Sequence, residues 1–135
     1  MRPGGDEKGL RLVGRTIFEG KAEGTALVSS SPLSFYGGVN PDTGEVVERG
    51  HELQGKTVAG RVLVFPNGKG STVGSYVMYR LAKNGKAPCA IVNSKCETIV
   101  AVGAIISEIP CVDLVEIKKI RPGSKVRIDG ATVEF

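Results

Sequence analysis

Few of the side chains that build metal sites and base-stacking surfaces occur in this 135-residue sequence. It contains one histidine, three cysteines, no tryptophan and 5% aromatic residues. His51 stands alone, and the spacing of Cys89, Cys96 and Cys111 matches no zinc or iron–sulfur pattern. We therefore expect no metal site in this chain, no stacking surface for nucleic-acid bases, and three buried free thiols.

Long hydrophobic runs are also missing. The longest, Ile99–Ile106, is far shorter than the roughly 20 residues that a membrane-spanning helix needs. The beginning of the chain carries Asp6, Glu7 and Lys8 and has no apolar stretch that could act as a signal peptide. Together with the free cysteines, these observations predict a cytoplasmic protein that does not contact a membrane.

The charge of the chain is modestly positive and is not concentrated. Lysine and arginine number 18 against 14 acidic residues, which gives a formal net charge of +4. The densest basic group is interrupted by a proline and a glycine; it consists of Lys118, Lys119, Arg121, Lys125 and Arg127. A polyanion-binding protein gathers its basic residues on one face, so we interpret this group as a solvated strand and turn and expect no nucleic-acid partner.

The length and the glycine content predict one β-rich domain. A chain of this size can build one hydrophobic core, and 41% hydrophobic against 24% charged residues is typical of a globular protein. Nineteen glycines imply many tight turns. We expect a flexible tail over residues 1–9 and a single domain over residues 10–135. The expected strands cover residues 10–17, 24–28, 45–47, 58–65, 90–93 and 109–115, followed by a hairpin of 125–128 and 131–135 with a type I′ turn at Asp129-Gly130.

Two segments have helical spacing. Val73, Val77 and Leu81 recur every four residues, and Asn84-Gly85 supplies a stop signal. The apolar run of residues 99–106 also fits a helix, although it is short enough to be a strand. Because the first helix follows an apolar strand through a glycine-rich turn, we predict an α/β fold in which strands surround a buried strand–turn–helix unit.

The glycine-rich turn, residues 68–75, is the strongest candidate for a binding or catalytic site. Its glycines do not have the spacing of a phosphate-binding P-loop or of a dinucleotide fingerprint. Ser71 and Thr72 lie where the helix is expected to begin, next to Lys69. A helix N-terminus there would stabilise a carboxylate, a phosphate or an oxyanion. Capping of the helix by Ser71 explains the same residues without any ligand.

A serine nucleophile fits this turn less well. The nucleophile elbow of hydrolases places a glycine two residues on either side of the serine, and Val73 occupies the second of those positions. The only histidine, His51, lies in the polar segment Gly50-His51-Glu52. We interpret His51 as a surface residue, which leaves Ser71 without a histidine partner.

Four stretches carry a resemblance to a known family. They are Glu19–Val28, Ser34–Gly44, Val58–Pro66 and Gly68–Tyr76, and nearly the whole chain from about Gly14 onward fits. The shorter segments Asn84–Pro88, Val102–Ile106 and Ile109-Pro110 complete the resemblance. In these stretches the sequence resembles the small subunits of the aconitase-X branch of the aconitase superfamily, in particular the archaeal type that acts on mevalonate 5-phosphate. The resemblance implies an aconitase-like swivelling β/β/α domain, β-rich, with one or two buried helices.

The resemblance also implies an activity that needs a second chain. A large catalytic subunit, joined in a heterodimer or higher assembly, would carry a [4Fe-4S] iron–sulfur cluster that binds the substrate hydroxyl. A serine of the small subunit would remove the proton next to the carboxylate, which yields trans-anhydromevalonate 5-phosphate. By motif position that general base is Ser71. The arginine that follows the paired serine and threonine in aconitases is Val73 here, so contacts to the substrate carboxylate would come from elsewhere.

Further residues are expected to contact the phosphorylated hydroxy acid. Lys69, Gly70 and Thr72 flank the serine, and the pair Gly37-Gly38 follows an aromatic residue, where backbone can approach a ligand closely. Two alternatives stay open at this point. One is a small subunit of a cis-3-hydroxyproline dehydratase, and the other is a non-catalytic module that binds an anionic metabolite.

Overall fold

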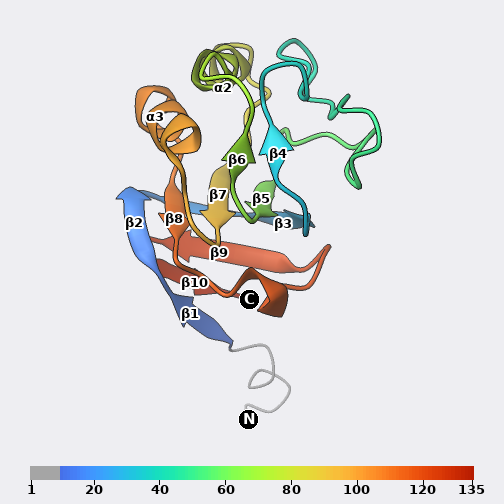
Figure 1. Cartoon of the computed structure of the whole chain (residues 1–135). Coiled ribbons are helices and arrows are strands. Elements are labelled where there is room, and N and C mark those ends of the chain that lie inside the picture. The colour runs from blue at the N-terminus through green and yellow to red at the C-terminus, as the bar shows by residue number, and fades with distance from the viewer. Residues whose placement is uncertain (1–9) are drawn as a thin grey trace.

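The computed structural model describes residues 10–135, so the expected tail, residues 1–9, lies outside the described residues. A curved sheet of eight strands carries two α-helices on one side, α2 (Gly74–Lys83) and α3 (Thr98–Ser107) (Figure 1). Its strands, in spatial order, are β1 (Arg11–Val13), β10 (Thr132–Glu134), β9 (Lys125–Asp129), β3 (Lys21–Val28), β5 (Val62–Phe65), β7 (Ala90–Asn93), β8 (Cys111–Asp113) and β2 (Arg15–Phe18). A two-stranded sheet pairs β4 (Leu33–Ser34) with β6 (Gly68–Lys69), and a short 3-10 helix covers Ile117–Lys119.

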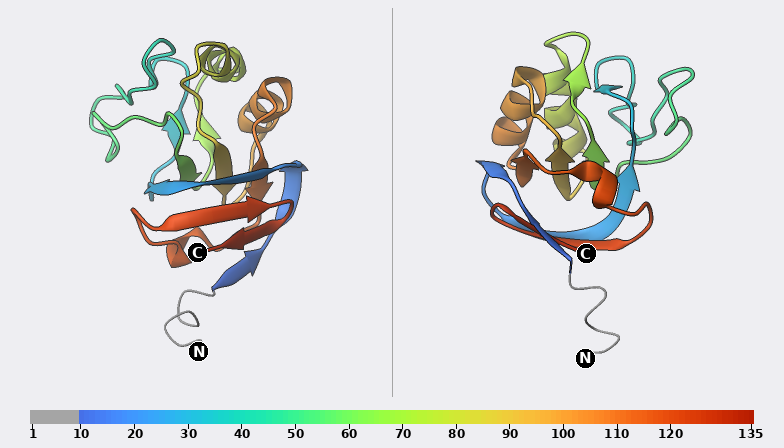
Figure 2. Two further views of the ribbon diagram at one scale, coloured as in Figure 1. Left: turned by 180° about the vertical axis from the view of Figure 1, so that it is seen from behind. Right: turned by 60° about the horizontal axis from the view of Figure 1, so that its bottom comes forward.

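The large sheet curls until its two end strands meet. β1 and β2 lie at opposite ends of the strand order, yet Gly14 alone separates them in the sequence (Figure 2). No side chain fits at position 14, because a Cβ atom there would run into the carbonyl oxygen of Asp113 and the side chain of Val115. The predicted strand 10–17 is therefore divided at Gly14 into two strands that close the sheet.

The two predicted helices are confirmed, and both lie on the same face of the sheet (Figures 1 and 2). α2 connects the parallel strands β5 and β7, and α3 connects β7 to β8. α2 ends at Asn84, followed by Gly85 with a φ of 71°, as the stop signal predicted. Among the described residues, neither helix has the length and apolar character to cross a membrane.

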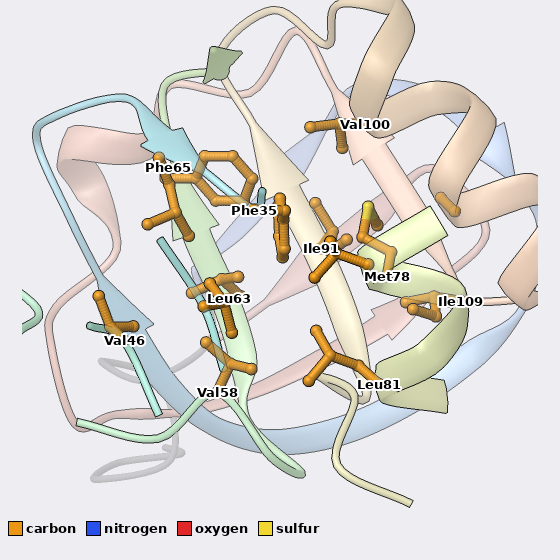
Figure 3. Close-up of a cluster of buried hydrophobic side chains, with 14 of the residues drawn as sticks. Phe35, Val46, Val58, Leu63, Phe65, Met78, Leu81, Ile91, Val100 and Ile109 are labelled. Atoms are coloured by element: carbon orange, nitrogen blue, oxygen red, sulfur yellow. The ribbon is translucent and has the colours of Figure 1, made fainter. Parts of the chain in front are cut away.

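Each face of the parallel strands carries its own hydrophobic cluster. Leu63, Phe65 and Ile91 point toward the helices, where they pack with side chains such as Met78 and Leu81 (Figure 3). Alternate residues of the same strands face the inside of the curled sheet; they include Val62, Val64 and Val92. All residues of β5 and β7 are buried, which explains why these strands are apolar apart from Asn93 at the end of β7.

Three strand predictions were too long or absent in the structure. The strand expected over residues 109–115 covers only Cys111–Asp113. The strand expected over residues 58–65 begins only at Val62, because Gly60 adopts a positive φ of 70° and donates its N–H to the carbonyl of Ala87. In the range 45–47, only Glu45 and Val46 take part in isolated bridges, and no strand forms. The positive φ at Gly60 therefore interrupts the predicted extended segment, and the strand starts only after this turn.

The C-terminal hairpin is confirmed, but its turn lies one residue later than predicted. Asp129 pairs with Thr132, so Gly130 and Ala131 are the two central residues. Of these only Gly130 has a positive φ, 60°. A type I′ turn requires positive φ at both central positions, so the prediction of that turn type was wrong.

A buried carboxylate fixes the edge of the sheet to the segment before α3. Asp113 on β8 is fully buried and accepts two hydrogen bonds from the guanidinium of Arg15 on β2, at 2.9 and 2.8 Å. The same carboxylate accepts the N–H of Cys96 at 2.8 Å. Burial alone would raise the pKa of Asp113, but Arg15 and the Cys96 N–H outweigh it and hold the pKa below its ordinary value.

Asp113→Asn is expected to lower the free energy of unfolding at pH 7 by about 1–3 kcal/mol, because a buried acceptor loses its charge and one of its partners. The lowered pKa of Asp113 stabilises the protein at neutral pH, and this stabilisation is lost as the pH falls below about 4 toward the lowered pKa. The variant should lack that part of the acid dependence in urea unfolding at several pH values.

Glu134→Gln is the matched control for this prediction. Glu134 also pairs with an arginine, Arg11, at 2.8 Å, but both side chains are solvent-accessible. Such a pair contributes less than about 1 kcal/mol. Equal losses of stability in the two variants would contradict the role given to Asp113.

Candidate active site

The glycine-rich turn lies beside the loop that contains the glycine pair. β6 runs parallel to β4, with Leu33 opposite Gly68 and Ser34 opposite Lys69 (Figure 1). This pairing places the segment after β4, which includes Gly37 and Gly38, next to the segment after β6, which includes Ser71. The structure therefore brings together the Gly37-Gly38 segment and the glycine-rich turn, which the sequence analysis singled out as separate site candidates.

Ser71 does not stand at the first residue of the helix, as expected, but in a turn just before it. α2 begins at Gly74, and its N-cap residue, Val73, makes no side-chain cap. The N–H of Gly74 donates to the carbonyl of Ser71 at 2.9 Å, and the N–H of Ser75 donates to that of Thr72 at 3.2 Å. The first amides of the helix are thus used within the turn and do not point freely at a ligand.

The hydroxyl of Ser71 receives one backbone hydrogen bond. The N–H of Val73 donates to Ser71 Oγ at 3.1 Å, and the residue is half-buried. Over residues 10–135, the hydroxyl of Ser71 finds no acceptor, and the N–H groups of Ser71 and Thr72 donate no hydrogen bond. A donor aimed at Oγ stabilises negative charge there, and the unused amides can receive an anion.

Lys69 is held by an acidic partner that the sequence did not reveal. Its ammonium forms an ion pair with Glu48 at 2.7 Å, and Glu48 also accepts the N–H of Ser34 at 3.2 Å. Partial burial alone would raise the pKa of Glu48, but Lys69 and the Ser34 N–H outweigh it and keep the pKa below its ordinary value. An anionic ligand at Lys69 would compete with the Glu48 carboxylate for the ammonium group.

The glycines of the site have different roles. Gly70 has a φ of 89°, and a Cβ atom there would lie 2.5 Å from the hydroxyl of Ser34, so glycine is needed for both conformation and space. Gly37 has a φ of 80° and open space around it. Gly38 is buried, and its carbonyl accepts the N–H groups of Val47 and Glu48. Gly38 therefore packs the loop, and its contact with a ligand stays a prediction.

His51 is not the surface residue that its polar surroundings suggested. It is 9% exposed; its Nδ1 accepts the N–H of Leu53 at 3.0 Å and its Nε2 lies 3.0 Å from the carbonyl of Pro32. The ring therefore holds the loop of residues 48–55 against the segment that enters β4. These bonds leave it no partner role at Ser71.

The cysteines are less uniformly buried than expected. Cys111 is buried, whereas Cys89 and Cys96 are half-buried. Contact with Cys96 and burial raise the pKa of Cys111, and burial raises the pKa of Cys89, which keeps these thiols protonated and unreactive at neutral pH. Within residues 10–135, no three histidine, cysteine, aspartate or glutamate side chains gather closely enough to hold a metal ion. The described cysteines do not fit an iron–sulfur cluster.

Comparison with known proteins identifies the family. The sequence model of a protein family, the aconitase X swivel domain, matches residues 11–135. This chain belongs to the aconitase X swivel domain family. The crystal structure of Thermococcus kodakaraensis aconitase X in its holo-form contains a similar chain, with a TM-score of 0.92, 56% sequence identity, and 93% of this chain and 98% of that chain covered. The swivel-domain fold class, rich in β-strands and carrying two helices, is thereby confirmed.

Two curated relatives of this aconitase X swivel domain share a name. The phosphomevalonate dehydratase small subunit of Thermococcus kodakarensis is 56% identical over 125 residues, which is 93% of this chain and 94% of that protein. The small subunit of the same name from Methanosarcina acetivorans is 58% identical, with 90% of this chain and 87% of that protein covered. The aconitase X swivel domain of this chain thus spans nearly the full length of both relatives.

The requirement for glycine at position 70 can be measured by comparison with Gly55. The two residues have nearly the same φ, 89° and 88°, but a Cβ at position 55 meets nothing within 4 Å. Gly55→Ala should cost about 1–2 kcal/mol of unfolding free energy from backbone strain. Gly70→Ala should cost about 1 kcal/mol more, because its Cβ also displaces Ser34.

Removal of the Ser34 hydroxyl provides the control. In the double variant Gly70→Ala with Ser34→Ala, most of the extra loss at position 70 should disappear in urea unfolding, after correction for Ser34→Ala alone. If Gly70→Ala and Gly55→Ala are equally destabilised, the close approach of Ser34 does not constrain the turn.

Proposed function

We propose that this chain is the small subunit of a phosphomevalonate dehydratase, a hydro-lyase that removes water from mevalonate 5-phosphate to give trans-anhydromevalonate 5-phosphate. The observation that carries the proposal is the 56% identity to a small subunit of that name, over 93% of this chain. A small subunit requires a larger partner, and the aconitase family suggests an iron–sulfur cluster in that partner. When bound there, the cluster supplies the Lewis acid for the substrate hydroxyl.

Ser71 is the general base of the proposed reaction. The base must remove one proton from the carbon next to the carboxylate, and the electron pair left on that carbon forms the double bond as the hydroxyl departs. A serine hydroxyl is a weak base in water, so it needs groups that stabilise its alkoxide. The N–H of Val73, at 3.1 Å from Oγ, is such a group, and the positive end of α2 lies three residues further on.

The surrounding residues bind the anionic substrate. The N–H groups of Ser71 and Thr72 are the donors for a carboxylate or phosphate oxygen, in place of the arginine found in aconitases. The ammonium group of Lys69 forms an ion pair with the substrate in place of its ion pair with Glu48. Gly70 gives the turn its shape, and the open side of Gly37 leaves room for the ligand.

Ser71→Ala tests the proposed base. In the complex reconstituted with the large subunit, kcat for dehydration of mevalonate 5-phosphate should fall about 10²–10⁴-fold, because the proton acceptor is removed. The matched control is Ser124→Ala, whose hydroxyl only donates to the carbonyl of Arg121 in a distant turn. Its kcat should stay within about twofold of the unmodified complex.

Turnover near the unmodified rate in the Ser71→Ala complex would show that another group is the base. Substrate identity is tested in the same assay. Dehydration of cis-3-hydroxyproline at a higher kcat/KM than mevalonate 5-phosphate would contradict the proposed substrate. Tight binding of mevalonate 5-phosphate to the isolated chain, without turnover in the complex, would favour a non-catalytic binding module.

Lys69→Met should raise KM for mevalonate 5-phosphate about tenfold with a smaller change in kcat, because a charge that binds the substrate is lost while the base is kept. Lys56→Met, at another exposed lysine, is the control and should leave KM unchanged. An unchanged KM in Lys69→Met would show that Glu48 keeps Lys69 occupied during the reaction.

A further inference from the structure

The outer face of α3 is apolar and exposed. α3 (Thr98–Ser107) contains no charged residue, and its inward side is buried at Val100, Gly103 and Ala104. On the opposite side Val102, Ile105 and Ile106 are 42%, 48% and 40% exposed. A helix that is apolar on all sides is normally covered on all sides, so this face is suited to contact another protein surface.

A groove between α2 and α3 continues this face. Its volume is about 280 Å³, and it is lined by Tyr76 of α2 and by Val73, the N-cap residue of that helix. Val102 and Ile106 line it from α3, and among residues 10–135 no lysine, arginine, aspartate or glutamate side chain takes part. We call these residues and the exposed face of α3 the α2–α3 groove. Its lack of charge fits an apolar segment of a partner protein and not an anionic ligand.

The groove is preformed by tight contacts between the helices. The hydroxyl of Ser75 donates to the carbonyl of Ile99 at 2.7 Å, which joins α2 to the first turn of α3. Gly103 lets α3 approach α2 closely, because a Cβ atom there would overlap the sulfur of Met78. A partner therefore meets a rigid surface and loses little binding free energy to rearrangement.

The groove lies next to the turn that contains Ser71. Thr72 and Val73, which line one end, directly follow Ser71 in the sequence. On the other side of the turn lies Tyr36, which is 56% exposed and whose N atom would be 3.5 Å from a Cβ at Gly74. Exposed apolar side chains thus flank the proposed base on both sides. A protein seated on them also covers Ser71.

We propose that the large subunit docks on the α2–α3 groove through an uncharged, apolar segment. This inference rests on the proposed function, in which Ser71 must reach a substrate held by the large subunit. A second copy of this chain in the groove would cover Ser71 and exclude that subunit. The groove is the centre of an interface that extends over the Ser71 turn to Tyr36, since stable interfaces bury about 800 Å² on each partner.

Val102→Glu and Ile106→Glu, each in the full chain, test the docking surface by calorimetric titration with the purified large subunit from the same source. Each carboxylate would be buried without a partner, so Kd should rise about tenfold to a hundredfold. The matched control is Val13→Glu. Val13 is also an exposed apolar residue, at 69%, but it lies on strand β1 and not on α2 or α3. Its Kd should stay within about twofold.

Measuring kcat at saturating concentrations of both chains distinguishes a loss of docking from a loss of catalysis. Complexes of Val102→Glu and of Ile106→Glu should recover kcat at high concentration, because Ser71 is intact, whereas Ser71→Ala should bind with the unmodified Kd and remain inactive. An active Ser71→Ala complex together with weak binding of the groove variants overturns the proposed base and leaves the docking surface standing. Thermal unfolding of each variant confirms its fold, and Ile105→Ser replaces any glutamate variant that unfolds.

Two results would overturn the docking proposal. One is an unmodified Kd for the groove variants, with Ser71→Ala inactive, which would place the interface on another face while the proposed function stands. The other is sedimentation of the unmodified chain as a dimer that the glutamate variants abolish, with unchanged affinity for the large subunit. In that case a second copy of this chain occupies the groove.

Discussion

The geometry of the candidate site depends on the hydrogen bonds that the buried carboxylate of Asp113 accepts. Through Arg15 it holds the edge strand that closes the sheet, and through the N–H of Cys96 it holds the segment that leads into α3. The next residue, Glu97, caps α3 by accepting the N–H groups of Ile99 and Val100, both at 2.9 Å. A Cβ at Gly68 would lie 2.5 Å from that Glu97 carboxylate, so the cap packs directly on the strand that runs into Lys69 and Ser71. A continuous series of contacts therefore connects the closed sheet to the turn.

This framework is compatible with the catalytic role proposed for a chain that has few catalytic side chains. With one histidine, held in a loop by two hydrogen bonds, and cysteines that do not gather, the described residues offer no self-contained acid–base or metal chemistry. They do offer a serine with a donor at its oxygen, unused amides beside it, and an apolar surface that continues from it. Such a turn becomes effective when a partner covers it and excludes water. The proposed function thus divides the chemistry between two chains.

Local patterns in the sequence predicted the parts of the site that are formed locally. The β-branched run before Pro66, the helical spacing of Val73, Val77 and Leu81, and the glycines of the turn were sufficient for the strand–turn–helix unit. Contacts between distant segments were not predictable in this way. Glu48 reaches Lys69 only because β4 and β6 pair, and His51 is buried only because Pro32 and Leu53 satisfy both ring nitrogens. The family resemblance, and not the spacing, singled out Ser71 as the base.

The most direct test of the account is a crystal structure of this chain bound to its large subunit and mevalonate 5-phosphate. The account predicts that Ser71 Oγ lies about 3–3.5 Å from the substrate carbon next to the carboxylate, the distance expected for a group poised to remove its proton. It also predicts that the large subunit covers the turn. A Ser71 hydroxyl turned away from that carbon, with a side chain of the large subunit in its place, would contradict the central claim.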